Sequence, residues 1–316
     1  MAGHASTPLY SRFGTPPLMT KKLTIGFIGA GLMGHGIAKN LLLAGYPLIL
    51  MGHKNRAPID DLVRQGAVEA HSPGEIASKV DMLFLCVTSS AVVETLMSGD
   101  NGIIQAGRPG LIVVDASTGD PAATIALGAR LSSRGIHLVD APLTRTPREA
   151  EDGRLNILIS GKPDIVAQVH EVATSFCENI FEIGELGSAL KLKLINNLLS
   201  LGHAVLAAEA VNAARATGVD LAKLHAVVSR GGANSAAFGM IVSHLLEGDD
   251  TGMQFSMRNA RKDLGCYRRM VEGTDLMNLL AGSAYDAYNL ATIMGHGEKL
   301  LSQMSGIFSA EHLAGK

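Results

Sequence analysis

The sequence lacks the features that mark several large classes of protein. It contains no Trp, and aromatic residues make up only 4% of its 316 residues, so a surface that stacks nucleic-acid bases is not expected. Its formal net charge is −2, which provides no basic footprint for nucleic acid. No apolar run in the sequence suggests a membrane-spanning segment, so we expect no membrane partner.

Cysteine and metal-binding patterns are also scarce. The three cysteines are too few and too scattered for a disulfide framework or a metal cluster, and we expect buried thiols in a reducing, cytoplasmic setting at Cys86, Cys177 and Cys266. The 11 His residues show no His-x-x-x-His spacing with carboxylates, so we predict no metal site. Residues 1–21 carry Pro, Gly and Ser but no apolar core of a signal peptide, and we interpret them as a loose extension.

A glycine-rich turn stands near the start of the remaining chain. Residues 23–29 form a short apolar run, and a helical pattern covers residues 35–43. Between them, Gly29 would make a tight turn, Gly31 would let the backbone approach a pyrophosphate, and Gly34 would let the helix pack closely on the strand. The free N–H groups of the helix start would then bind the phosphates. The alternative is a structural turn without a ligand. We predict dinucleotide contacts at Gly29, Gly31, Leu32, Met33 and Gly34.

The end of the second strand, at residues 47–51, bears on the choice of cofactor. An acidic residue there would bind the ribose 2′-hydroxyl of NAD, whereas basic residues would accept the 2′-phosphate of NADP. No acid occurs before Asp60, and three basic candidates, His53, Lys54 and Arg56, follow the strand. This favours NADP over NAD, with a solvated basic turn as the alternative.

Further strand signals follow at residues 81–87, 111–115, 136–140 and 156–160. In open α/β sheets, ligands bind outside the carboxyl ends of the strands. Val87 and Thr118, at or just past two of these ends, are therefore candidate cofactor contacts. Ser89 and Ser90 lie nearby, but we expect them to cap the next helix. Residues 141–147 then form a loop bracketed by two prolines, in which Arg145 could bind an anionic group or could be an ordinary surface arginine.

The most informative stretch covers residues 184–200. Lys193, Asn196, Asn197 and Ser200 stand at i, i+3, i+4 and i+7, which places them on one face of a helix. Leucine and isoleucine fill the neighbouring positions, so little of this helix is expected to face water. Buried polar groups need partners, and here the partner could be a substrate. The alternative is a lysine that reaches out to solvent beside asparagines that bind backbone groups.

Helical patterns dominate after this point, at residues 190–217, 220–229, 236–246, 257–272 and 276–294. We therefore predict two domains. The first is an α/β Rossmann domain at residues 22–186, with a doubly wound, mostly parallel sheet. The second is an all-helical domain at residues 187–316 for substrate binding and oligomerisation.

Taken together, these motifs resemble the β-hydroxyacid dehydrogenases, a family that includes 3-hydroxyisobutyrate dehydrogenase and tartronate semialdehyde reductase. The matching segments are residues 29–42, 115–118, 140–146, 184–197 and 262–263, in that order, within residues 22–302. The resemblance implies NAD(P)-dependent interconversion of a small β-hydroxy acid and its aldehyde or ketone. It also implies a homodimer or homotetramer.

The resemblance assigns roles residue by residue. Lys193 matches the family's catalytic lysine, and Asn196 and Asn197 match its asparagine pair. Thr118 and Lys262 match cofactor-contacting positions, and the substrate loop corresponds to Thr144, Arg145 and Thr146.

This chain departs from the family in that loop, where most members have Ser-Gly-Gly, and at Ala189, where most have glycine. The Arg-Thr loop, with Ser200 downstream, resembles the 3-sulfolactaldehyde reductase branch. There an arginine, the first asparagine and a serine bind a sulfonate, and Arg145, Asn196 and Ser200 match those positions.

We accordingly expect hydride transfer with Lys193 handling the alcohol proton, because a desolvated lysine has a lowered pKa and can donate or accept. We expect the leucine-rich helix and Arg145 to lower that pKa together. Asn196 would orient the lysine or the hydroxyl, and Arg145, Thr146 and Ser200 would hold the acid group. Two alternatives remain. One is an imine or ketone reductase, although these usually lack the lysine. The other is a non-catalytic dinucleotide-binding module.

Overall fold

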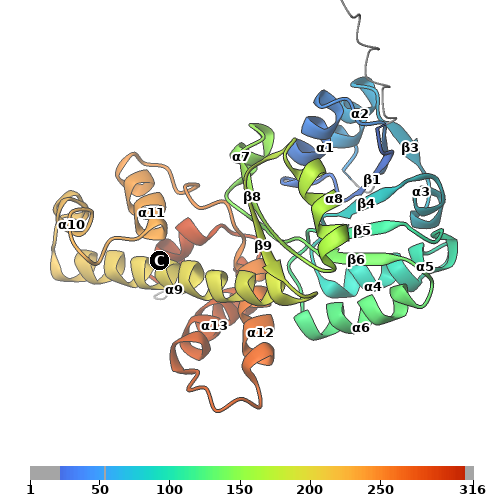
Figure 1. Ribbon diagram of the computed structural model, residues 1–316. Helices are drawn as coiled ribbons and strands as arrows, with labels where there is room; N and C mark the ends of the chain where they lie inside the picture. The colour runs from blue at the N-terminus through green and yellow to red at the C-terminus, as the bar shows by residue number, and fades with distance from the viewer. Residues whose placement is uncertain (1–21, 53–54, 310–316) are drawn as a thin grey trace, which may run out of the picture.

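The computed structural model describes residues 22–52 and 55–309, which form a sheet-based part followed by a helical part (Figure 1). The sheet has nine strands, in the order β3-β2-β1-β4-β5-β6-β8-β7, with β9 also paired to β8. The strands are β1 (Ile25–Ile28), β2 (Leu48–Met51), β3 (Val68–Ala70), β4 (Met82–Leu85), β5 (Ile112–Asp115), β6 (His137–Asp140), β7 (Leu143–Thr144), β8 (Leu155–Ser160) and β9 (Cys177–Gly184).

The first six strands are parallel, and each connection from one of them to the next returns the chain to the same end of the sheet. The helices are α1 (Gly34–Leu43), α2 (Ala57–Arg64), α3 (Pro73–Lys79), α4 (Ser90–Ser98), α5 (Ile103–Ala106), α6 (Pro121–Ser132), α7 (Pro147–Glu151) and α8 (Pro163–Ala173). One apolar core lies between the sheet and α1, α2 and α8, and another between the sheet and α3, α4 and α6. The predicted doubly wound Rossmann architecture is confirmed.

Three strands were not predicted, namely β3, β7 and β9. The longest of them, β9, carries Glu178 and Glu182, and most of its residues are exposed or half-buried. It therefore lacks the continuous apolar run by which the buried parallel strands were recognised.

The glycine turn has the geometry that its sequence indicates. Gly29 has a φ of +104°, and a Cβ there would lie 2.2 Å from the carbonyl oxygen of Cys86. A Cβ on Gly34 would lie 2.1 Å from the carbonyl oxygen of Gly29, so these two positions exclude any side chain. Gly31, in contrast, is exposed and has open space around it. The turn is thus tightly packed on its inner side and open on its outer side.

The helical part is built around one long helix, α9 (Ser188–Thr217). α11 packs on one side of it, and α12 and α13 pack on the other (Figure 1). The helices after α9 are α10 (Leu221–Val228), α11 (Ala236–Leu246), α12 (Met257–Val271), α13 (Leu279–Ala291) and α14 (Met304–Ile307), with the short turns η1 (Thr292–His296) and η2 (Leu301–Gln303) between the last two. The predicted all-helical second part is confirmed.

Two expectations about α9 were wrong. Leu192, Ile195 and Leu199 are 40%, 45% and 59% exposed, because α11, α12 and α13 cover only the other sides of the helix. By length and composition alone, the helix could also cross a membrane. An 18-residue stretch of it has a mean hydropathy of 1.3, and 39% of that stretch is buried. The core helix of a soluble protein meets the same criterion, and α9 packs at the centre of the helical part.

Candidate active site

The first turns of α9 bring the four predicted polar side chains together on one side of the helix. Lys193 and Ser200 are half-buried, Asn197 is buried and Asn196 is exposed. Within the group the hydrogen bonds are long, at 3.4 Å from Asn196 Nδ2 to Asn197 Oδ1 and 3.4 Å from the Ser200 hydroxyl to the Asn197 carbonyl. Bonds of that length are weak, so Asn196 and Ser200 keep most of their capacity to bind another molecule.

Asn197 has a strong partner in the second helix of the site, α12. Its amide Nδ2 donates to Oδ2 of Asp263 at 2.7 Å, and the other oxygen of Asp263 lies 2.9 Å from Lys262 Nζ. Asp263 is only 2% exposed, and a buried carboxylate is stable only when it is paired in this way. The sequence left open whether residues 261–263 form a solvated face or an internal ion pair, and the structure shows an ion pair between Lys262 and Asp263. A closer look at the pattern of α12 would have found Asp263, because it shares the buried face of that helix with Ala260, Leu264 and Tyr267.

Lys262 connects this helical cluster to the Rossmann sheet. Its ammonium donates to the carbonyl oxygen of Thr118 at 2.6 Å, just past the end of β5. The neighbouring Ser117 accepts a hydrogen bond from the backbone N–H of Val87 at 3.0 Å, past the end of β4. One residue earlier, the Cys86 carbonyl is the group against which Gly29 packs. A continuous line of contacts therefore runs from the glycine turn, across the ends of β4 and β5, to the polar face of α9.

This line brings the predicted cofactor positions to one edge of the sheet. The ends of β1, β4 and β5 are level, since Ile28 pairs with Leu85 and Leu85 with Asp115. Gly31 and Leu32 are open to solvent above that edge, and α1 begins directly behind them. An open glycine turn before a helix N-terminus fits the pyrophosphate of a dinucleotide.

Two ionisable groups beside this edge, the buried Asp115 and the half-buried Lys193, have shifted pKa values. Burial raises the pKa of Asp115 to about 6, with a smaller contribution from the charge of Asp140, whereas hydrogen bonds from Ser117 and the charge of Lys262 oppose the rise. Burial lowers the pKa of Lys193, and the charge of Lys262 lowers it further, whereas Asp263 opposes that change. The predicted direction for Lys193 is confirmed.

The predicted cause was wrong in one respect, because the cation that depresses the pKa of Lys193 is Lys262 rather than Arg145. Arg145 adopts a φ of +81°, and its guanidinium forms an ion pair with Glu178 on β9 and donates to the Arg154 carbonyl. Within the described residues, no hydrogen bond or ion pair joins Arg145 to α9. This pairing could not be predicted from the sequence, because β9, which carries Glu178, was not predicted.

The two threonines of the substrate loop also have local partners. Thr146 caps α7, with its hydroxyl and its backbone N–H bonded to Glu149. The Thr144 hydroxyl accepts a hydrogen bond from Asn156 at 3.1 Å. Both hydroxyls therefore stabilise the shape of the loop in this structure.

The basic residues after β2 are only partly described. His53 and Lys54 lie outside the described residues. Arg56 donates to Glu69 at 2.5 Å and to Asp60 at 2.9 Å, so its charge is already paired. Ser89 caps α4, as expected, and accepts a hydrogen bond from Val92, but the same expectation was wrong for Ser90, which is the first residue of α4 and accepts a hydrogen bond from the Asp120 N–H at 2.9 Å. Cys177 and Cys266 are buried thiols, whereas Cys86 is only half-buried. Within the described ranges, no group of three or more His, Cys, Asp or Glu is arranged to hold a metal ion.

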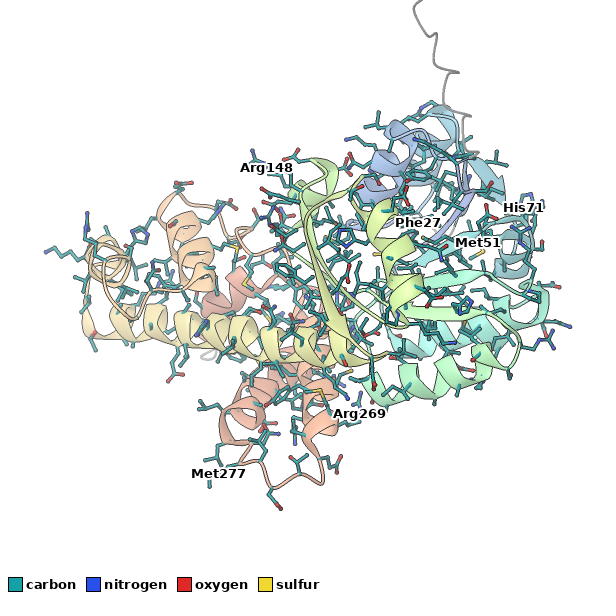
Figure 2. The ribbon with its side chains drawn as sticks, viewed as in Figure 1. Phe27, Met51, His71, Arg148, Arg269 and Met277 are labelled. Atoms are coloured by element: carbon teal, nitrogen blue, oxygen red, sulfur yellow. The ribbon has the colours of Figure 1, made fainter. Side chains whose placement is uncertain are left out.

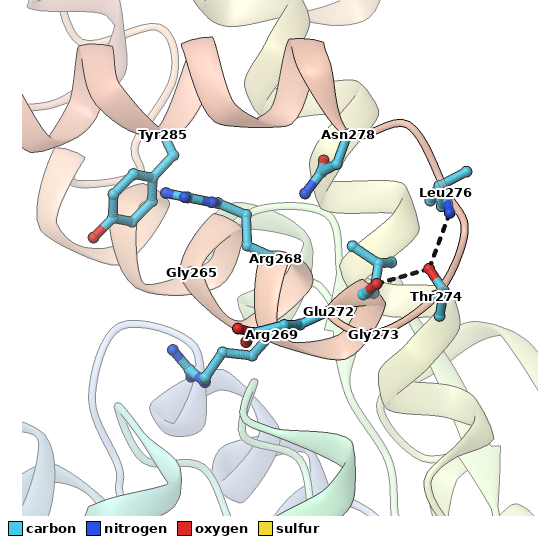
Figure 3. A pocket seen from close by; sticks show the side chains of 10 residues that line it. Gly265, Arg268, Arg269, Glu272, Gly273, Thr274, Leu276, Asn278 and Tyr285 are labelled. Atoms are coloured by element: carbon cyan, nitrogen blue, oxygen red, sulfur yellow. Dashed lines mark hydrogen bonds between the residues drawn. The ribbon is translucent and has the colours of Figure 1, made fainter.

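A hollow of about 420 Å³ lies elsewhere, between the end of α12 and the start of α13 (Figure 3). Arg268 lies over the ring of Tyr285, 4.7 Å from its centre, and Arg269 forms an ion pair with Asp120 of the Rossmann part at 3.2 Å. Figure 2 shows Arg269 at the junction of the two parts and Met277 at the far tip of the helical part. No residue predicted for the site lines this hollow.

Comparison with known families agrees with this architecture. A family model described as the NAD binding domain of 6-phosphogluconate dehydrogenase matches residues 24–184. A second model, described as NAD-binding of NADP-dependent 3-hydroxyisobutyrate dehydrogenase, matches residues 187–306. An L-threonate dehydrogenase from Cupriavidus necator is 30% identical over 92% of this chain and 98% of its own length. The chain belongs to the β-hydroxyacid dehydrogenase family of NAD(P)-dependent oxidoreductases.

Other relatives differ in what their names describe. A 2-(hydroxymethyl)glutarate dehydrogenase from Eubacterium barkeri is 27% identical over 92% of this chain and 98% of its own length. The cytokine-like nuclear factor N-PAC from Xenopus tropicalis is also 27% identical, over 90% of this chain but only 53% of that protein.

Solved structures share the fold along nearly the whole chain. A 3-hydroxyisobutyrate dehydrogenase from Salmonella typhimurium has a TM-score of 0.82 and 27% identity, and covers 91% of this chain and 100% of its own. Psf3 in complex with NADP+ and 2-OPP has the same TM-score and identity, covering 90% and 100%. An imine reductase variant from Myxococcus stipitatus, with a TM-score of 0.61 and 20% identity over 91% of this chain and 100% of its own, is similar in fold alone.

The electrostatic arrangement predicts how Lys262 affects the pH dependence of this family's reaction. When Lys193 acts as the proton donor in reduction, kcat/KM should fall as the pH rises through its pKa. Lys262→Met removes the cation that depresses this pKa, so the falling limb should move to higher pH, in addition to any loss of rate.

The measurement is kcat/KM for carbonyl reduction as a function of pH. Lys191→Met, an exposed lysine on the same helix, is the control and should leave the limb in place. A limb that stays in place in Lys262→Met would contradict the electrostatic role of Lys262.

Proposed function

We propose that this protein interconverts a small β-hydroxy acid and its aldehyde with NAD(P), and that Lys193 transfers the alcohol proton. The observation that carries the proposal is the line of contacts from the glycine turn through Thr118, Lys262 and Asp263 to the Lys193 face of α9. It connects a dinucleotide-binding edge with a desolvated lysine, which is the pairing that an alcohol–carbonyl reaction requires.

We assign dinucleotide binding to Gly29–Gly34, Val87, Thr118 and Lys262. The nicotinamide supplies or accepts the hydride when it is bound. We favour NADP over NAD because no acidic residue stands at the end of β2 before Asp60. A related structure that holds NADP+ supports the same choice.

The chain's own contribution would be proton transfer and orientation. In reduction, the Lys193 ammonium donates a proton to the carbonyl oxygen as it becomes an alcohol. In oxidation, the neutral amine accepts the hydroxyl proton. The lowered pKa makes the neutral amine more accessible than in an ordinary lysine, and the fixed pair of Asn197 with Asp263 holds the helix face on which Lys193 stands.

The substrate would carry an anionic tail, either a carboxylate or a sulfonate. Asn196 and Ser200 make only long hydrogen bonds and share a helix face with Lys193, so both are suited to contact that tail. Arg145 would join them after exchanging Glu178 for the substrate. The Arg145–Glu178 pair is partly exposed, with 30% and 49% of the side chains accessible, and exposed ion pairs contribute little to stability because solvent screens them. A well-placed anion can therefore displace Glu178.

Replacing Lys193 tests the reaction. Lys193→Ala should lower kcat for aldehyde reduction by about 100- to 10,000-fold, because the proton donor is lost, while NADPH binding stays unchanged. Turnover is measured with a panel of small aldehydes and both cofactors, and binding by NADPH fluorescence. Lys191→Ala is the matched control and should retain activity. If Lys193→Ala retained the wild-type rate, the assignment would be refuted, and if the wild type bound NADPH without turnover on any aldehyde, the chain would be a binding module.

Replacing Arg145 tests the nature of the substrate. Arg145→Gln removes a charge-assisted contact and should raise KM for acid-tailed aldehydes by about 10- to 100-fold, without affecting uncharged aldehydes. Glu178→Gln removes the competing carboxylate and should lower KM by about two- to fivefold. Comparing carboxylate- and sulfonate-tailed aldehydes then identifies the preferred acid. A wild-type preference for uncharged aldehydes would contradict the role of Arg145.

We also propose that the chain forms a homo-oligomer through the exposed apolar stripe of α9, defined as Leu192, Ile195, Leu199 and Leu206. These residues lie on one face by helical spacing, and exposed apolar patches of this kind mark association surfaces. Sedimentation analysis of the wild type should show a dimer or tetramer, and Leu206→Lys should weaken it. Val68→Lys, at an exposed valine on β3, is the control. A wild type that sediments as a monomer would refute this proposal.

A further inference from the structure

The N-terminus of α9 is capped from the sheet rather than from its own sequence. The first residue before the helix is Gly187, which has no side chain to bind the free N–H groups of the first turn. Asp140, at the end of β6, takes this role. Its Oδ1 accepts from the Gly187 N–H at 2.8 Å, and its Oδ2 accepts from the Leu190 N–H at 2.9 Å.

Ser160 completes the arrangement from the neighbouring strand. Asp140 and Ser160 face each other across the antiparallel pair of β6 and β8. The Ser160 hydroxyl donates to Asp140 Oδ1 and accepts from the Ala189 N–H at 3.0 Å. Both side chains are fully buried, at 0% exposure. Three N–H donors of the helix start, those of Gly187, Ala189 and Leu190, are thus bound by two side chains of the sheet.

The site requires a carboxylate. Three donors converge on Asp140, and an ionised carboxylate has only acceptors to offer them. An asparagine of the same shape would direct its NH₂ group at one of these donors, and no water can compensate in a fully buried position. Burial raises the pKa of Asp140, while the hydrogen bonds from Ser160, Gly187 and Leu190 oppose that rise.

The approach of α9 to the sheet is also sterically defined. Gly187 has a φ of +91°, and a Cβ there would lie 3.0 Å from Ile125 of α6. Further along, Leu201 of α9 is held by the Tyr288 hydroxyl of α13 through its carbonyl oxygen, at 2.8 Å. Asp140 and Ser160 therefore hold the sheet end of a helix whose middle is held by the helical part. Lys193 lies one turn beyond Leu190, about 4.5 Å along the axis.

We propose that Asp140, supported by Ser160, is a positioning residue for the reaction. Its hydrogen bonds hold the first turn of α9 against the sheet and so fix the position of Lys193 relative to Lys262 and Asp263. This inference rests on the proposed function for the role of Lys193. Asp140 is buried and does not touch the substrate, yet it controls the position of the Lys193 amine.

The test uses the full-length protein with Asp140→Asn and Ser160→Ala. Ser160→Ala keeps both direct bonds from Asp140 to α9, so it should have the smaller effect, and it remains informative if Asp140→Asn does not fold. The matched control is Asp220→Asn, which weakens a side-chain cap on α10 (Asp220 accepts from the Lys223 N–H at 3.0 Å) but does not affect the seat of α9. Circular dichroism and size-exclusion chromatography check that each variant is folded.

Two readouts separate positioning from general stability. In steady-state reduction of the preferred aldehyde, Asp140→Asn should lower kcat by about 10- to 100-fold, because a small displacement of the amine is costly, with NADPH affinity unchanged. In a turnover-independent assay, lysines are dimethylated with ¹³C-formaldehyde and titrated by NMR, and the Lys193 signal is assigned by its absence in Lys193→Arg. The Lys193 titration should move toward the ordinary lysine range in Asp140→Asn, and less so in Ser160→Ala, because the amine leaves its desolvated place between Lys262 and Asp263. Asp220→Asn should match the wild type in both assays.

The outcomes are distinguishable. A folded Asp140→Asn with wild-type kcat and an unmoved Lys193 titration overturns the inference. If Asp140→Asn does not fold, wild-type values in Ser160→Ala overturn it. If the wild type reduces no aldehyde but the Lys193 titration still moves in Asp140→Asn, the proposed function fails and the positioning role of Asp140 stands.

Discussion

The buried carboxylate of Asp263 is the constraint on which the rest of the candidate site depends. It is 2% exposed, and its two oxygens are paired with Asn197 on α9 and with Lys262, whose ammonium also binds the sheet at Thr118. A buried charge of this kind does little for net stability, yet removing one partner typically costs about 3–5 kcal/mol because the other charge stays buried and unpaired. The pairing therefore specifies one arrangement of α9, α12 and the end of β5. That arrangement is what places a desolvated lysine beside the dinucleotide edge.

The parts that the sequence predicted well are those set by local rules. The glycine turn was recognisable because close backbone contacts at Gly29 and Gly34 leave no room for a Cβ, so only glycine can stand there. The polar face of α9 was recognisable because helical spacing alone puts Lys193, Asn197 and Ser200 on one side. The parallel strands were recognisable because burial on both faces produces continuous apolar runs. Each of these patterns depends on neighbours within a few residues along the chain.

The parts that the sequence did not reveal depend on partners far away in the chain. Arg145 pairs with Glu178, 33 residues later, on a strand whose two glutamates and mostly exposed residues conceal its place in the sheet. The apolar residues of α9 read as core positions, yet Leu192, Ile195 and Leu199 lie on a side that no other helix covers. Asp263 is an intermediate case, because its position on the buried face of α12 is local information but its partners are not. Hydropathy shows which residues tend to avoid water, but it does not show which other part of the molecule will cover them.

Three sides of α9 have different surroundings, and this explains the composition of the helix. One side packs in the core of the helical part through Leu201, Ala204 and Val211, a second carries the polar group around Lys193, and a third is apolar and exposed. A helix with a single apolar stripe would have a clear amphipathic pattern, whereas α9 is apolar on most sides over 30 residues and thereby resembles a membrane span. Because apolar residues lie on most sides of α9, hydropathy alone does not set its rotation, and specific polar contacts do so. Asp140 and Ser160 supply these contacts at the start of the helix, and the Asn197–Asp263 pair supplies them about one turn beyond Lys193, so they lie on either side of the lysine along the chain.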